Sequence, residues 1–250
     1  MKVKELVNFL FEIAPENLKE DYDNVGLLVG DENAEISGVL VALDCFSEVV
    51  NRAEELEANV IVTHHPVIFD PLKSVTEQSL VYQLVKKGIS VISMHTNLDK
   101  AEGGVNDALC SALGLNGVKT VDTHEGFPIR IGQLTSPQNP YTFAKTIKKA
   151  LGGYVKFVSK EGKEIKTVAV CSGSGGDFIY DALRFGADAL VTADIKHHLF
   201  IEAGENNISL YDAGHFNTED VMIAPLCERI KDTFNDLPVF QCHLSKIQSI

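Results

Sequence analysis

Residues 58–65 read Ala-Asn-Val-Ile-Val-Thr-His-His, and residues 187–194 read Ala-Asp-Ala-Leu-Val-Thr-Ala-Asp. Each stretch contains a short apolar run that is typical of a buried strand. A further strand-like run and then a helical pattern precede each stretch, and these earlier runs lie at residues 36–44 and 165–173. The spacing is constant, because 187 minus 58 and 165 minus 36 both equal 129. A strand, helix, strand order that recurs at one offset indicates an internal duplication.

A third pair of segments agrees with this duplication after a small gap. The first copy is residues 89–91 (Ile-Ser-Val) and 95–99 (His-Thr-Asn-Leu-Asp), and the second copy is residues 208–210 (Ile-Ser-Leu) and 215–219 (His-Phe-Asn-Thr-Glu). A chance likeness between two α/β units is the alternative explanation, and we favour the duplication because three segments agree in order. Strands that alternate with helices predict the α/β class.

The repeats also predict how the chain is divided. We assign a first α/β repeat to residues 1–125 and a second α/β repeat to residues 126–250. Residues 127–160 contain shorter strand-like runs and no low-complexity linker. We therefore expect two halves that pack together and interleave, rather than two tethered domains.

The composition limits the possible partners. With 22 basic and 35 acidic residues the formal net charge is −13, and no run of Lys and Arg forms a stripe that follows a phosphate backbone. We therefore expect no nucleic acid as a primary partner. The apolar runs are strand-sized and the N-terminus lacks an apolar signal-peptide core, so we expect a cytoplasmic protein that does not enter a membrane. The five cysteines are scattered without a C-x-x-C pair, which argues against disulfides and thiolate metal sites.

Polar side chains follow the strands of both repeats. Ligands of open α/β sheets bind beyond the carboxyl ends of the strands. Five residues of metal-binding type lie at such ends: His64, His65, Asp99, His215 and Glu219. If the two repeats face each other, these five side chains meet in one site.

The spacing of these residues suits two metal ions. Adjacent histidines on an extended backbone point in different directions, so His64 and His65 can each bind a different ion. Asp99 and Glu219 each lie four residues after a histidine, on the same face of a helical turn, and a carboxylate can bridge two metals. Five ligands do not fill two coordination shells, and open positions are typical of catalytic sites. Nitrogen and oxygen ligands predict two divalent ions per chain, with zinc, iron, manganese, nickel and cobalt equally suitable.

Other histidines are candidates for catalysis. His95 and His198 are the candidates for proton transfer, and the catalytic residue is otherwise unknown. Residues 194–198 fit hydrogen bonding to a metal ligand, a proton shuttle or an exposed polar loop. A lone His-His pair is more often a coincidence than a ligand set. Here the pair and both His-x-x-x-carboxylate motifs lie at equivalent strand ends, which favours the metal site.

Five motifs resemble those of the NIF-three-like family, whose members are labelled GTP cyclohydrolase I type 2 homologues. In chain order they are residues 23–30 (Asp-Asn-Val-Gly-Leu-Leu-Val-Gly), 63–66 (Thr-His-His-Pro), 95–99, 192–198 (Thr-Ala-Asp-Ile-Lys-His-His) and 215–219. The resemblance covers residue 1 to about residue 235. It implies two similar, interleaved α/β halves with mixed sheets flanked by helices, and a dinuclear metal centre that uses the five ligands named above. It also implies toroidal homohexamers in the cytoplasm.

Longer members of that family insert an extra domain between the halves. Only residues 100–164 separate the repeats here, so we expect no inserted domain. A two-metal site with open positions predicts a metal-dependent hydrolase that acts on a small anionic substrate, and the family label makes GTP ring opening the named candidate. The alternative is a metal-handling or regulatory assembly protein without turnover, because no general acid or base is unambiguous beside the ligands.

Overall fold

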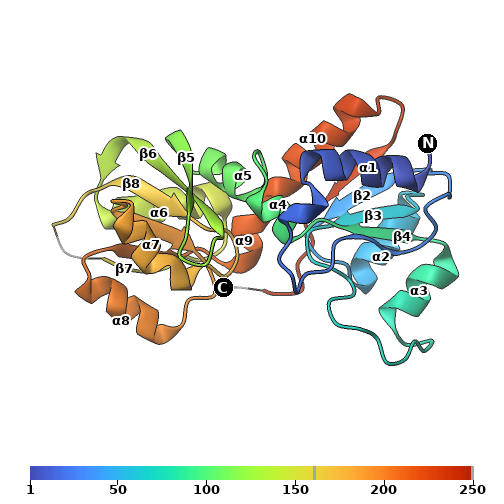
Figure 1. Ribbon diagram of the computed structural model, residues 1–250, viewed down its shortest axis with the longest axis horizontal. Coiled ribbons are helices and arrows are strands. Elements are labelled where there is room, and N and C mark those ends of the chain that lie inside the picture. The colour runs from blue at the N-terminus through green and yellow to red at the C-terminus, as the bar shows by residue number, and fades with distance from the viewer. Residues whose placement is uncertain (160–161, 249–250) are drawn as a thin grey trace. The chain divides into compact units, whose positions relative to one another are not determined.

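The computed structural model describes residues 1–159 and 162–248 of the chain. The chain divides into two compact units, each of the predicted α/β class (Figure 1). The first unit comprises Met1–Gly104 and Met222–Lys246, and the second comprises Val105–Val221 with Ile247 and Gln248. The first unit is thus built from two separate stretches of chain.

Helices and short strands alternate along both units. The first unit contains α1 (Val3–Ile13), the 3₁₀ turn η1 (Glu16–Leu18), β1 (Gly26–Val29), β2 (Val39–Ala42), α2 (Ser47–Glu55), β3 (Val60–Thr63), α3 (Leu80–Lys87), β4 (Ser90–Ser93), α4 (Thr96–Lys100), α10 (Ile223–Thr233) and β11 (Val239–Cys242). The second contains α5 (Val105–Ala112), β5 (Asn116–Asp122), β6 (Pro128–Gln138), α6 (Pro140–Leu151), β7 (Lys156–Val158), β8 (Ile165–Val170), η2 (Gly176–Phe178), α7 (Ile179–Arg184), β9 (Ala189–Thr192), α8 (His197–Glu205), β10 (Ser209–Asp212) and α9 (His215–Glu219). The 3₁₀ turn η3 (Asp220–Met222) follows α9. Among the described residues, no helix combines the length and hydropathy needed to cross a bilayer.

The first unit contains one mixed sheet with the strand order β1-β4-β3-β2-β11. Its last four strands are parallel, and β1 pairs antiparallel with β4 at one edge. Every residue of β2, β3 and β4 is buried, as expected of a parallel sheet with helices on both faces. In Figure 1, α1 and α10 cover one face, and α2 and α3 cover the other. On the second of these faces, Val49 and Leu84 pack with Leu40 and Ile61.

The second unit also contains one mixed sheet, with the strand order β5-β6-β8-β9-β10-β7. Its three central strands β8, β9 and β10 are parallel, and the others are antiparallel to their neighbours. Helices α5 and α6 contribute Leu109 and Phe143 to one core cluster, and α7 and α8 contribute Ile179 and Leu199 to another. The sheet therefore has helices on both faces.

Local sequence signals account for the starts of two helices. The side chain of Asn139 accepts a hydrogen bond from the Thr142 N–H at 2.9 Å, and Pro140 occupies the first turn of α6. Ser79 caps α3 in the same way, through the Tyr82 N–H at 3.3 Å. These caps satisfy amide groups that the first helical turn leaves without intrahelical partners.

The compact units do not follow the sequential halves 1–125 and 126–250. Strand β11 pairs with β2 in the first sheet, and α5 and β5 belong to the second unit. The reason is hydrogen bonding at the sheet edges. The ladder from β11 to β2 and the ladder from β5 to β6 each join a strand to the sheet of the other sequential half.

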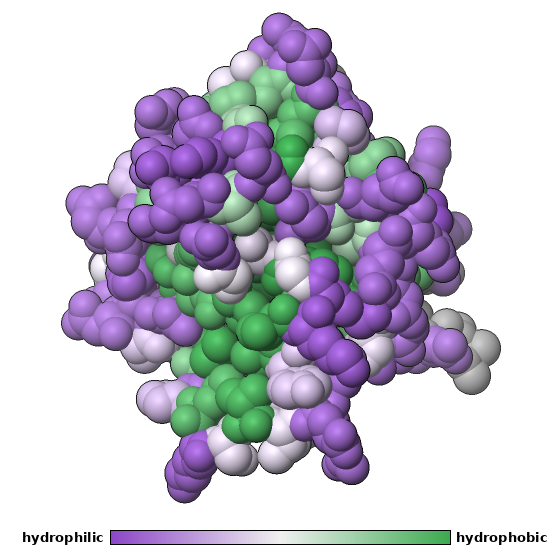
Figure 2. Space-filling model, turned by 90° about the vertical axis from the view of Figure 1, so that its right-hand side faces the viewer, coloured by the Kyte–Doolittle hydropathy of each residue, from purple (hydrophilic) through white to green (hydrophobic). Residues whose placement is uncertain are grey.

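Apolar side chains reach the surface of the first unit. Figure 2 shows them gathered on one face of the molecule, bordered by hydrophilic residues. The large apolar residues exposed on the first unit include Leu72, Val75 and Val85. Exposed apolar area that is contiguous is typical of a surface that binds another molecule.

Candidate metal centre

His64 and His65 lie in a bend that directly follows β3. The parallel hydrogen-bond ladder continues to this point, because their N–H groups donate to the carbonyl oxygens of Ala42 at 3.3 Å and Leu43 at 3.0 Å. The two imidazole rings do not point apart as expected of neighbours on a strand, since their centroids lie 5.0 Å apart. The alternation of side chains applies to extended strands, and the bend lies beyond the last strand residue.

His95 and Asp99 form a cluster with this pair. His95 directly precedes α4, and the Asp99 N–H donates to the His95 carbonyl oxygen at 3.1 Å. The ring centroid of His95 lies 5.2 Å from that of His64 and 5.6 Å from that of His65. One ligand atom from each of these three imidazoles lies within 4.8 Å of the others, and His64 Nε2 lies 3.6 Å from Asp99 Oδ1. The first unit therefore offers three nitrogen donors and one carboxylate that could hold a metal ion.

Each of these histidines places Nδ1 against an oxygen that can only accept a hydrogen bond. The pairs are His64 with the Met94 carbonyl oxygen at 2.9 Å, His65 with Asp44 Oδ1 at 2.7 Å, and His95 with Asp23 Oδ1 at 2.7 Å. Nδ1 must therefore carry a hydrogen, and the lone pair of the neutral ring lies on Nε2. This tautomer, fixed by an outer oxygen, is typical of histidines that coordinate a metal through Nε2.

Asp23 holds His95 from the loop before β1. The carboxyl group is buried, and its second oxygen accepts hydrogen bonds from the N–H and the hydroxyl group of Thr96. Burial alone raises the pKa of Asp23, but the hydrogen bonds from His95 and Thr96 outweigh burial and hold this pKa well below its usual value. Asp23 is therefore ionised at neutral pH and fixes the orientation of the His95 ring.

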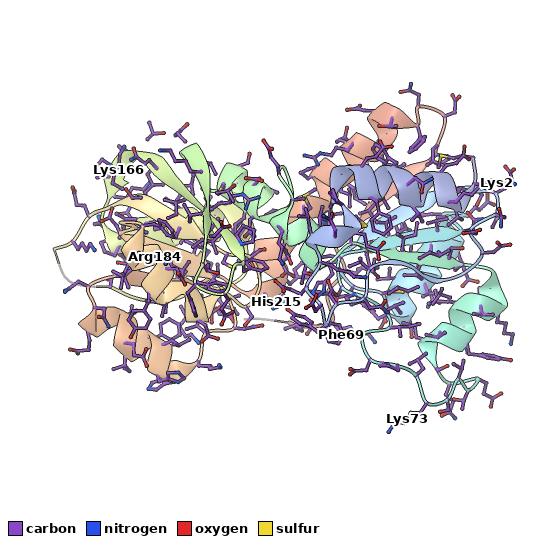
Figure 3. All side chains as sticks on the ribbon, in the orientation of Figure 1. Lys2, Phe69, Lys73, Lys166, Arg184 and His215 are labelled. Atoms are coloured by element: carbon purple, nitrogen blue, oxygen red, sulfur yellow. The ribbon has the colours of Figure 1, made fainter. Side chains whose placement is uncertain are left out.

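His215 and Glu219 lie one turn apart on α9 of the second unit (Figure 3 labels His215). His215 Nε2 lies 3.1 Å from Glu219 Oε2, and His215 Nδ1 lies 2.7 Å from Asp194 Oδ2. Burial lowers the pKa of His215, but Glu219 and Asp194 outweigh burial and raise it to about 9. Two carboxylates around one imidazole create a local field that favours a cation.

Gly173 leaves room for the Glu219 carboxylate. Its N–H donates to the hydroxyl oxygen of Thr218 at 3.0 Å, and its backbone has a φ of +59°. A Cβ atom at position 173 would meet the Glu219 carboxylate oxygen and would lie 3.3 Å from the His215 ring. The loop after β8 therefore approaches the two donor groups closely because it carries a glycine there.

The structure brings together, within each unit, the site residues that the sequence places in that half. His64, His65 and Asp99 form one cluster, and His215 and Glu219 form the other. His95, expected only as a candidate proton carrier, lies among the imidazoles of the first cluster. Its alignment with His215 in the repeat was the available signal.

The sequence left three alternatives for residues 194–198. For Asp194 the structure shows hydrogen bonding to a candidate metal ligand, because its Oδ2 lies 2.7 Å from His215 Nδ1. His198 is exposed on the first turn of α8, and its catalytic role stays a prediction. Asp23 and Asp44, which hold His95 and His65, were not predicted. Asp44 ends the strand-like run at residues 36–44, and Asp23 begins the family motif at residues 23–30.

Comparison with known proteins places the fold and these motifs in one family. Residues 1–249 match the Duf34/NIF3 (NGG1p interacting factor 3) family. The chain belongs to the Duf34/NIF3 family. A Clostridium perfringens member named GTP cyclohydrolase 1 type 2 homolog is 37% identical over 242 residues, which cover 93% of this chain and 92% of the relative. A Campylobacter jejuni member with the same name is 36% identical over 244 residues, with 93% of each chain covered.

Solved structures of similar proteins agree with this Duf34/NIF3 assignment. A crystal structure of a Staphylococcus aureus hypothetical protein has a TM-score of 0.94 at 31% identity, covering 100% of this chain and 99% of its own. Reduced HcgD from Methanocaldococcus jannaschii has a TM-score of 0.81 at 30% identity, covering 96% and 97% of the two chains. The predicted fold, with two mixed sheets flanked by helices, is therefore confirmed.

Proposed function

We propose that this Duf34/NIF3 member binds two divalent metal ions and hydrolyses a small anionic substrate, with GTP ring opening as the named candidate reaction. The proposed ligands are His64, His65 and Asp99 of the first unit together with His215 and Glu219 of the second. Relatives named GTP cyclohydrolase 1 type 2 homolog support the choice of reaction.

The observation that carries the metal proposal is the set of Nδ1 hydrogen bonds. His64, His65 and His215 each place Nδ1 within 2.9 Å of a carboxylate or carbonyl oxygen. In each ring the Nδ1 hydrogen leaves Nε2 as the metal-binding atom, and at His215, whose pKa is raised to about 9, a bound metal ion would replace the Nε2 proton. Imidazole nitrogen and carboxylate oxygen suit zinc, iron, manganese, nickel or cobalt.

The number of ligands supports catalysis over a closed structural site. Three imidazoles and two carboxylates leave coordination positions of two ions to water or substrate. Bound divalent ions would act as Lewis acids and make water a stronger nucleophile near neutral pH. The carboxylates of Asp44 and Asp194 would meanwhile keep the His65 and His215 rings in position.

Metal content is the first test. We expect roughly two ions per chain in the purified parent protein, falling to one or none in the Glu219→Gln variant. Glu202→Gln on α8 is a matched control on a surface helix, where we expect no change. A parent protein that binds no divalent metal under any loading condition would contradict the proposal.

His95 requires its own variant, because its position fits a further ligand and a proton carrier. If His95 carries protons, His95→Gln keeps its metal and loses turnover. If His95 coordinates, the variant loses metal as well. Elemental analysis of the variant, measured beside its rate, distinguishes the two roles.

The alternative function is metal handling without turnover. It predicts that His64→Ala abolishes metal binding while no substrate in a panel of GTP, other nucleotides, phosphoesters and cyclic amides is converted by the loaded parent. Turnover of any panel member that is lost together with metal in His64→Ala favours the hydrolase.

We also propose that copies of the chain assemble into a toroidal homohexamer in the cytoplasm. The exposed apolar residues of the first unit, such as Val85, support self-association. Light scattering should give six times the 27.3 kDa mass of the chain. A mass equal to a single chain at micromolar concentration would contradict it.

A further inference from the structure

An aromatic pair adjoins the imidazole cluster of the first unit. Tyr22 and Phe69 are 67% and 48% exposed, and their ring centroids lie 6.3 Å apart with 49° between the planes. The Phe69 centroid lies 6.2 Å from that of His95, at an interplanar angle of 80°. Figure 3 shows Phe69 on the loop that leads from β3 to α3. Two large rings are thus accessible directly beside a residue of the candidate centre.

Hydrogen bonds hold the segments of both rings near the cluster. Tyr22 directly precedes Asp23, whose carboxylate accepts a hydrogen bond from His95. Phe69 directly follows Ile68, whose carbonyl oxygen accepts a hydrogen bond from Asn24 Nδ2 at 2.7 Å. The loop that carries Phe69 is therefore joined to the loop that carries Tyr22. Rings held in this way lose little conformational entropy when a ligand binds.

We propose that Tyr22 and Phe69 form the surface on which a planar heteroaromatic ring of the substrate lies beside His95. The inference rests on the proposed function, because it assigns the ring-binding part of the same site. Aromatic side chains stack on nucleobase-like rings through their faces, and such stacking tolerates different ring substituents. A ring that lies on Phe69 brings one edge toward the His95 imidazole.

A small heteroaromatic ring suits this surface better than a protein partner does. The rings border a polar cluster that contains the carboxylates of Asp23, Asp44 and Asp99. Of these side chains that of Asp44 is 42% exposed, so a protein interface across the rings would bury its charge, and the centres of protein interfaces are depleted of charged residues. A small ring covers the aromatic faces and leaves the Asp44 carboxylate in contact with water.

A fluorescent variant provides a direct binding measurement. The chain contains no tryptophan, so Tyr22→Trp introduces the only indole and keeps an aromatic face at this position. We expect guanosine to change the fluorescence emission of this indole in a saturable manner. Ribose, which shares the sugar and lacks the ring, should leave the emission unchanged.

Leucine variants test whether the rings supply affinity. Calorimetry should show guanosine binding about tenfold weaker in Phe69→Leu and in Tyr22→Leu, while Phe69→Tyr stays close to the parent. Tyr180→Leu in the second unit removes a ring that is 54% exposed, between the values for Phe69 and Tyr22, and should have no effect. Metal content should equal that of the parent in all four variants, because no ring atom is a metal donor.

The outcomes separate this inference from the proposed function. Equal guanosine affinity in the parent and in Phe69→Leu overturns the ring surface, as does ribose binding as tight as guanosine binding. Ring-dependent guanosine binding by a chain that holds no metal upholds the surface and overturns the metal hydrolase. Metal-dependent turnover by a parent that binds no guanosine does the reverse. A changed assembly mass in Phe69→Leu, without guanosine binding, assigns the rings to a contact between copies and also overturns the inference.

Discussion

The first and second units pair their central strands in the same way. In each, three parallel strands are followed by a short helix. Helix α9 carries both His215 and Glu219, whereas α4 carries Asp99 and is directly preceded by His95. The partners across the three strands are Val39, Val60 and Ser90 in the first unit, and Val168, Ala189 and Ser209 in the second. Val168 and Ala189 lie 129 positions after Val39 and Val60, which is the offset of the sequence repeat. The duplicated sequence is therefore matched by a duplicated hydrogen-bond register.

The units differ in the residues that follow the strands. His64 and His65 come after β3, whereas Ala193 and Asp194 occupy the equivalent positions after β9. Asp194 accepts a hydrogen bond from His215. The second unit therefore uses this position to orient a candidate metal ligand instead of supplying one. The shared framework thus sets where a side chain can reach, and the residue at that place, His65 or Asp194, determines whether it fits a metal ligand or a positioning group.

The largest effect that we expect is a loss of stability in the second unit alone, which would make the two units differ. Arg130 on β6 is 1% exposed, and its guanidinium donates to Asp107 Oδ1 at 2.9 Å and Oδ2 at 3.0 Å. Asp107→Ala removes this carboxylate and should lower the free energy of unfolding by about 3–5 kcal/mol. Hydrogen exchange should show the loss mainly in Val105–Val221.

A surface ion pair of the first unit serves as the control for this prediction. Lys231 Nζ lies 3.4 Å from Glu228 Oε1, and both side chains are exposed. Glu228→Ala should change stability by less than about 1 kcal/mol. Equal loss of exchange protection in both units of Asp107→Ala would show that they unfold as one framework.

The next effect sharpens the comparison of the positioning carboxylates. Asp44→Asn in the first unit and Asp194→Asn in the second should each weaken metal affinity by about 10–100-fold, because each carboxylate orients a proposed ligand. Competition with a chelating dye measures the affinity. The exposed Asp232 provides the control variant Asp232→Asn. A loss in one variant alone would mean that a single unit holds the metal.

Asp44 of the first repeat and Gly173 of the second occupy equivalent positions, and we expect a smaller effect from a substitution of Gly173. Gly173→Ala should destabilise the protein by about 1–2 kcal/mol through its positive φ. It should also lower metal content, because the added Cβ displaces Glu219. Gly117→Ala is the matched control, since Gly117 has a φ of +61° and open space around it. The same metal content in both variants would contradict the displacement of Glu219.

The parallel strands and the clustering of candidate ligands within each unit were predictable from the sequence for a physical reason. Buried parallel strands need continuous apolar runs, and residues 58–65 and 187–194 contain them. The candidate ligands His64 and His65 directly follow the first of these runs. The edge position of β11 was not predictable, because it depends on a long-range ladder to β2.

The positioning groups were not predictable for a related reason. Asp44 is 21 residues from His65, and Asp23 is 72 residues from His95. Neither separation along the sequence matches a helical or strand period, so only the folded sheet shows that these side chains meet. Local pattern therefore indicates which residues can bind a metal, and tertiary structure determines which residues orient them.

The smallest effect concerns His124, a histidine of the second unit outside the ligand cluster. Its Nδ1 and backbone N–H lie 2.7 Å and 2.9 Å from the two carboxylate oxygens of the buried Asp181. The hydrogen bond to Asp181 raises the pKa of the exposed His124 ring above 6.5. A pKa raised by folding means that this group stabilises the protein fully below pH 6.5, and that its contribution is lost as the pH rises through the folded value.

His124→Gln isolates this contribution, because glutamine keeps the backbone N–H and removes the titrating ring. The parent should exceed the variant in unfolding midpoint well below pH 6.5, and the difference should shrink by about pH 9. Thermal unfolding at both pH values measures it. A difference that stays constant or grows with pH would mean that Asp181 holds the His124 loop through the backbone hydrogen bond and ring packing alone, without help from the ring's charge.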